Sequence, residues 1–183
     1  MAKQEQDGWL RLESRFRKIG WTIGGLLLLA PLVAMQFTEE VKWTAGDFVF
    51  MGLLIGGTGG LYELAARTTS GLAYRFAAGA ALGAGFLLIW LSGAVGIIGS
   101  ENEPLNQLYF LVLAIAAVGG FVVDFKPRRM AWVMTTAAAA QMGVAVIALF
   151  HGYFTLPLNG IFAAIWMLSA WLFRKAAEGE SAS

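Results

Sequence analysis

The chain has 183 residues, of which 58% are apolar and only 14% are charged, and its mean hydropathy is +0.66. Soluble domains carry about a quarter charged residues, so this composition excludes an ordinary water-soluble domain and makes the lipid bilayer its expected partner. Cysteine is absent, which excludes disulfides and thiolate chemistry. A net charge of +1 gives no reason to expect a nucleic-acid partner.

Six segments are predicted to be transmembrane helices. They run over residues 20–37, 47–66, 76–98, 107–123, 131–150 and 158–173. Each has about 16–23 residues, or roughly 24–35 Å of helix, and the last is the shortest. The runs are continuously apolar and lack the alternation of barrel strands. We therefore predict an all-α polytopic membrane helix bundle, with its six-helix domain at residues 20–174 and a short tail at 175–183.

The basic residues predict the orientation. With six spans, twelve of the 13 Lys and Arg residues fall on one side of the membrane, and Lys42 is alone on the other. Positive charge accumulates on the cytoplasmic side of membrane proteins. We expect both termini to be cytoplasmic, in a bacterial inner membrane.

The segment 1–19 precedes the first span. Trp9, Leu12, Phe16 and Ile19 recur at helical spacing between basic residues. This pattern predicts a short amphipathic helix on the cytoplasmic leaflet. The alternative is a basic flank that only sets the orientation.

Small residues indicate how the helices pack. Gly52, Gly56 and Gly60 share one face of the second helix, and Gly79 and Gly83 share one face of the third. Such faces let a neighbouring backbone approach closely. We expect the slim third and fifth helices in the middle of the bundle, and the bulkier first and sixth at its periphery.

Two stretches of the chain resemble each other. "GGLYELAAR" precedes "YRFAAGAALGAG", as "GGFVVDFKPR" precedes "RRMAWVMTTAAAA", so that Gly60 would correspond to Gly120 and Arg75 to Arg129. This predicts a parallel tandem repeat of two helices, the second and third against the fourth and fifth. The alternative is chance recurrence of Gly, Ala and interfacial Arg.

Polar residues inside the spans are few. No ionisable side chain falls in the middle third of any span, which argues against an ion-coupled pump. The most polar side chain at mid-depth is Gln141, with Thr58 on another helix and Trp90 deeper than the other aromatic residues. A hydrogen bond between helices is the expected role of Gln141, and a ligand contact is the alternative.

Charged residues at the span ends have structural roles by their spacing. Glu63 precedes Arg67 by four residues, which is the favourable order for an ion pair along a helix. We predict that this pair locks the end of the second span.

The stretch "WLSGAVGIIGSENEPLN", residues 90–106, starts as membrane helix and ends in acids and amides. Three glycines at three-residue intervals weaken its helix. Glu101 and Glu103 then share the outer face with His151, the only histidine. A solvated loop is the favoured interpretation, and a cation site formed by these three residues is the alternative.

Catalytic motifs are missing. The chain has no HExxH, GxSxG or GxxxxGK[ST] sequence. One histidine cannot supply both axial ligands of a b-type haem. We expect neither an enzyme nor a cofactor.

The stretches "DFVFMGLLIGGTGGLYELAAR", "YRFAAG" and "WLSGAVGIIGSENEPLN" together resemble an uncharacterised family of small multi-pass inner-membrane proteins of proteobacteria. The resemblance covers most of the chain from the second helix to the fourth. It implies a six-helix bacterial membrane protein and no known activity.

Two functions fit these observations. The first is an accessory or interaction subunit of a membrane complex, bound to a membrane-protein partner or forming a homo-oligomer. The alternative is a channel or transporter for an ion or a small solute.

Overall fold

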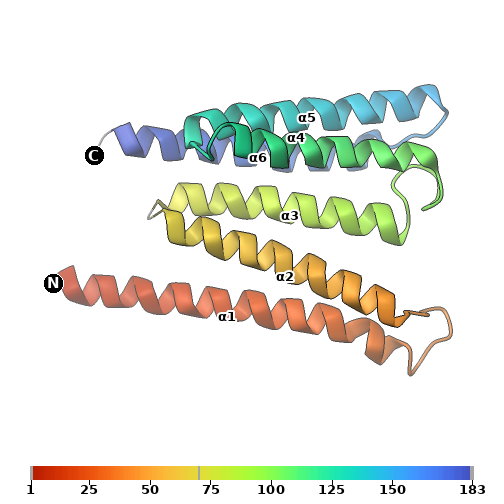
Figure 1. The fold of residues 1–183 in the computed structure, drawn as a ribbon, viewed down its shortest axis with the longest axis horizontal. Coiled ribbons are helices and arrows are strands. Elements are labelled where there is room, and N and C mark those ends of the chain that lie inside the picture. Colours follow the sequence, from red (N-terminus) through yellow and green to blue (C-terminus); the bar gives the residue numbers. More distant parts are fainter. Residues whose placement is uncertain (1, 70, 182–183) are drawn as a thin grey trace. The chain divides into compact units, whose positions relative to one another are not determined.

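The protein is described here from a computed structural model, which covers the backbone of residues 2–69 and 71–181 and the side chains of residues 18–67, 69 and 71–179. Within these ranges it is helical and has no strand. The elements are α1 (Ala2–Ala34), α2 (Ala45–Thr68), α3 (Leu72–Ala94), the 3-10 helix η1 (Pro104–Gln107), α4 (Leu108–Val122), α5 (Pro127–Phe150) and α6 (Leu156–Ser181) (Figure 1). The predicted all-α helix bundle is confirmed.

Five of the predicted spans coincide with helices that are long and apolar enough to cross a membrane. These stretches are Ala45–Arg67, Leu72–Ala94, Pro104–Val122, Pro127–Phe150 and Leu156–Gly179. In α1 the apolar part that is described, Lys18–Ala34, is shorter than the other five. Residues 2–19 of the predicted N-terminal segment continue into the first span as one helix. The side chains of its predicted amphipathic face lie outside the described residues, except for Ile19.

The helix boundaries have local causes. At the start of α2, the Thr44 N–H donates to Asp47 Oδ2 at 2.7 Å, and the Asp47 N–H reaches Thr44 Oγ1 at 3.4 Å, which is a capping box. Proline at the first position begins α5, because its missing N–H has no partner there anyway. The sixth helix is longer than predicted, since it begins at Leu156 and takes in the predicted tail to Ser181.

The chain divides into two compact units, Met1–Gly60 and Leu61–Ser183. In the first unit, α1 and the first part of α2 pack through glycines. A Cβ at Gly24 would lie 2.8 Å from Ile55 Cγ2, and one at Gly59 would lie 3.0 Å from the Trp21 ring. Each glycine thus leaves room for a large side chain of the other helix, Ile55 at Gly24 and Trp21 at Gly59.

The glycine face predicted for α2 is open, unlike the contacts at Gly24 and Gly59. At Gly52, Gly56 and Gly60, no heavy atom lies within 4 Å of the position a Cβ would occupy. The close packing predicted for this face is therefore not made within the unit Met1–Gly60.

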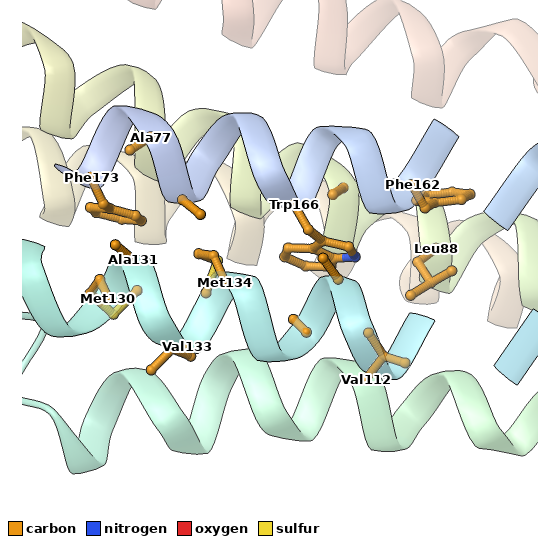
Figure 2. Packing of buried hydrophobic residues seen from close by; sticks show 14 of the residues in the cluster. Ala77, Leu88, Val112, Met130, Ala131, Val133, Met134, Phe162, Trp166 and Phe173 are labelled. Atoms are coloured by element: carbon orange, nitrogen blue, oxygen red, sulfur yellow. The ribbon is translucent and has the colours of Figure 1, made fainter. Parts of the chain in front are cut away.

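In the second unit, α3, α4, α5 and α6 run alternately up and down and share one core (Figure 1). Trp166 and Phe173 of α6 are each 1% exposed and lie between α6 and α5 (Figure 2). Across the other side of α6, Ser169 Oγ donates to the Ala77 carbonyl of α3 at 2.8 Å. The prediction of a peripheral sixth helix is wrong. The alanine-rich faces of α3 and α5 leave the space that the aromatic side chains of α6 fill.

The predicted repeat stays a prediction. The Cβ position of Gly120 lies 3.0 Å from the Phe125 ring, whereas Gly60 faces open space. The turn after α4 places Asp124 and Phe125 in the left-handed region, at φ 54° and 53°. The two glycines that the repeat would equate therefore have different surroundings.

Candidate functional site: a buried amide network

The most polar part of the core is a hydrogen-bonded network that joins three helices. Gln141 Nε2 on α5 donates to Asn159 Oδ1 on α6 at 2.8 Å, and both side chains have zero exposure. Asn159 Nδ2 in turn donates to the Tyr109 hydroxyl on α4 at 3.1 Å and to the Thr155 carbonyl at 3.0 Å. The hydrogen bond between helices predicted for Gln141 is confirmed.

The antiparallel order of the helices brings these residues together. Tyr109 and Asn159 lie near the starts of α4 and α6, and Gln141 lies in the last half of α5. They meet toward the end of the unit that carries the connections 95–107 and 151–155, here called the polar-loop end (Figure 1). Sequence reasoning missed Asn159 and Tyr109. An asparagine beside an apolar run, in "LPLNGIF", was the signal for the former.

Several buried polar atoms at the network and beside the core remain without a partner. Gln141 Oε1 accepts no hydrogen bond from the described residues, and Ser92 Oγ and Trp166 Nε1 likewise have no partner among them. Each unmet buried polar group costs about 1–3 kcal/mol. The network therefore orients the three helices but retains acceptor capacity at Gln141.

A second amide side chain, Asn106, organises the loop after α3. Its Oδ1 accepts from the backbone N–H groups of Ile97 and Ile98 at 3.0 and 2.9 Å. Its Nδ2 donates to the carbonyls of Ile98 and Ser100 at 3.0 and 2.7 Å. Gly96 supplies a φ of +73° that other residues rarely adopt. The end of "WLSGAVGIIGSENEPLN" is thus a folded loop held by one buried side chain.

Glu101, Glu103 and His151, the residues of the alternative cation site, each contact other groups. Glu103 Oε2 accepts from the Tyr153 hydroxyl at 2.9 Å, and His151 Nδ1 lies 2.9 Å from the Ile147 carbonyl of its own helix. Glu101 is exposed and accepts from Asn102. No group of three His, Cys, Asp or Glu side chains in the described part of the chain could hold a metal ion. The structure therefore gives the cation site no support.

The Glu103–Tyr153 contact closes the polar-loop end. The Tyr153 ring also packs 3.0 Å from the Cβ position of Gly99, which has a φ of +62°. The hydrogen bond to the Glu103 carboxylate, together with its negative charge, raises the pKa of Tyr153 above the ordinary value of a tyrosine. The contact ties the loop after α3 to the connection before α6.

The remaining predicted residues are not members of the network. Trp90 is half-buried and its ring centroid is 5.9 Å from that of Phe86 on the same helix. Thr58 is half-buried and belongs to the unit Met1–Gly60. The ion pair between Glu63 and Arg67 is confirmed at 3.0 Å. Because the arginine is 73% exposed, this pair contributes only about 0.3–0.5 kcal/mol.

Comparison with protein-family models, with curated proteins and with solved structures finds no match to this chain. Its class therefore follows from its own helices. Five of them are long and apolar enough to cross a bilayer, and many of their large apolar side chains are exposed. The chain is an integral membrane protein.

Proposed function

We propose that this protein is a non-catalytic accessory subunit of the bacterial inner membrane that binds another membrane protein through α2. Both termini would be cytoplasmic, as the basic residues indicate. The chain would belong with the small uncharacterised proteobacterial membrane proteins that it resembles. The observation that carries the proposal is the open glycine face formed by Gly52, Gly56 and Gly60.

Lipid solvates apolar side chains as well as a protein interior does, so the hydrophobic effect does not drive membrane helices together. They associate instead by close van der Waals packing. A helix that presents glycines four residues apart lets a second backbone approach and gain van der Waals contact. Large apolar side chains of α2 are exposed around this face, with Leu53 at 72% and Val49 at 62%. The face thus has the form of a helix-packing surface whose neighbour lies outside the unit Met1–Gly60.

The test is native mass spectrometry of the protein extracted gently from its own membrane. We expect a defined heteromeric mass, lost in Gly56→Leu because the leucine blocks close approach. Gly57→Leu is the matched control, since Gly57 is the adjacent residue, also has open space at its Cβ position, and lies off this face. A lone monomer or a homo-oligomer from wild-type membranes, or a heteromer that survives Gly56→Leu, would contradict the proposal.

Passage of a small solute is the second candidate function. The unpaired Gln141 Oε1 in a buried network favours it, because such an acceptor can exchange one polar partner for another. Wild-type protein in liposomes would then conduct, and Gln141→Leu would not. Thr135→Val is the control, since the Thr135 hydroxyl bonds only its own helix, at the Ala131 carbonyl. Impermeability to a broad panel of solutes would eliminate this function.

A further inference from the structure

A groove runs between α4 and α5 at the end of the second unit opposite the polar-loop end. It has a volume of about 390 Å³. Its lining residues share two helical faces, and all but two are apolar: Ile115, Gly119, Val123, Arg129, Trp132, Val133 and Thr136. Val133 lies between the two helices (Figure 2) and 2.7 Å from the Cβ position of Gly119, so the floor of the groove is tightly packed.

Positive charge stands at the mouth of this groove. Arg129 lines it three residues before Trp132, and the guanidinium carbon of Arg174 on α6 lies 5.7 Å from the centre of the Trp132 ring. Trp132 is 67% exposed, so this cation–π contact sits on the outer surface of the helices. The positive charge therefore lies beside the apolar groove, on the outer surface of the helices.

The neighbouring lysines are already paired, whereas these arginines are not. Lys175 Nζ lies 2.9 Å from Glu178, and Lys126 Nζ lies 4.0 Å from Asp124. Among the described residues, neither Arg129 nor Arg174 makes an ion pair. Two uncompensated guanidinium groups next to an apolar groove complement a ligand with an anionic head and a hydrocarbon tail.

We propose that this groove binds one anionic phospholipid, with an acyl chain along α4 and α5 and the phosphate between Arg129 and Arg174. Guanidinium groups suit phosphate because their planar donors match its oxygens. Trp132 lies in the second turn of α5, near the end of a membrane helix, where aromatic side chains are expected to meet lipid headgroups. The proposal rests on membrane integration alone and is independent of the accessory role proposed for α2.

The test measures lipid binding to the purified full-length chain in neutral detergent by native mass spectrometry. Phosphatidylglycerol is the probe, and phosphatidylcholine of the same acyl chains is the reference. We expect a preference for phosphatidylglycerol that falls about fivefold for each of Arg129→Gln and Arg174→Gln, the effect of one basic residue near an anionic headgroup. Arg128→Gln is the matched control, because Arg128 is exposed on the same turn but does not line the groove.

Three outcomes would overturn the proposal. The first is equal binding of both lipids by the wild type. The second is an equal loss in Arg128→Gln, which would show diffuse attraction instead of a site. The third is that glycerophosphoglycerol, the headgroup without acyl chains, binds as tightly as the lipid, because the apolar groove would then contribute nothing. Size-exclusion profiles identical to wild type would show that each variant is folded. Loss of a protein partner would leave every one of these results unchanged.

Discussion

The two units of this chain are stabilised in different ways. Helices α3 to α6 enclose a continuous core of large side chains with an amide network beside it. In the unit Met1–Gly60, α1 and α2 meet through single glycines at Gly24 and Gly59. Buried residues make up 39% of the apolar stretch of α5 but 6% of that of α2. The four-helix core can therefore specify its own packing, whereas little of α2 is buried.

The largest expected effect comes from the core of the second unit. Trp166→Ala should lower the free energy of unfolding by about 3 kcal/mol, because it leaves a cavity in the core. This is the lower end of the range for a buried aromatic residue, since lipid and not water surrounds the helices in the unfolded state. Trp171→Ala, at a position 54% exposed on the same helix, should change it little. Reversible unfolding in mixed micelles provides the measurement. Equal losses in the two variants would mean that α6 is not central.

The loops offer the next contrast. Asn106→Ala should cost about 2 kcal/mol, because it leaves two backbone N–H groups of the loop after α3 without an acceptor. Asp47→Ala removes an exposed capping carboxylate from the first unit and should cost less than Asn106→Ala. Unfolding free energies and protease cleavage within 95–107 would both report the difference. Equal losses of unfolding free energy in the two variants would show that the loop 95–107 does not unfold cooperatively with the core.

A pair of glycines distinguishes the packed face from the open one. Gly119→Ala should cost about 1–2 kcal/mol, because its Cβ would meet Val133 Cγ1 at 2.7 Å. In Gly56→Ala the added Cβ has no heavy atom within 4 Å, so the free energy of unfolding should stay within about 0.5 kcal/mol of the wild-type value. Any change should be a small increase, because alanine favours a helix more than glycine does. The same unfolding assay applies to isolated protein. A clear loss in Gly56→Ala would show that its face is already packed in the isolated chain.

The smallest effect concerns titration at the polar-loop end. Glu103→Gln should lower the pKa of Tyr153 toward the ordinary tyrosine value, because the carboxylate no longer favours the protonated phenol. The raised pKa means that the contact stabilises the fold below the unfolded tyrosine pKa, and that this contribution is lost as the pH rises through the folded one. Phenolate absorbance, with Tyr153→Phe as the subtraction control, measures the shift. An unchanged titration would show that the two side chains do not interact.

Much of the fold follows from local pattern. Apolar runs of sufficient length must form helices in lipid, because only a helix satisfies its backbone hydrogen bonds internally. The same reasoning placed the Glu63–Arg67 pair, whose four-residue spacing is a property of any helix. Gln141 was predicted to bond another helix because an amide inside a span requires a partner. The identity of that partner, Asn159, depended on which helices become neighbours.

The sequence by itself determined the set of membrane helices, because the length and hydropathy of each segment suit the bilayer independently of the other segments. The tertiary structure alone decided which helix is central. Small residues suggested α3 and α5 and bulk excluded α6, yet α6 is buried because Ala77 and Ala137 on its neighbours leave room for its aromatic side chains. Complementary shape between two surfaces is a property of the pair, and it is not contained in the composition of either helix.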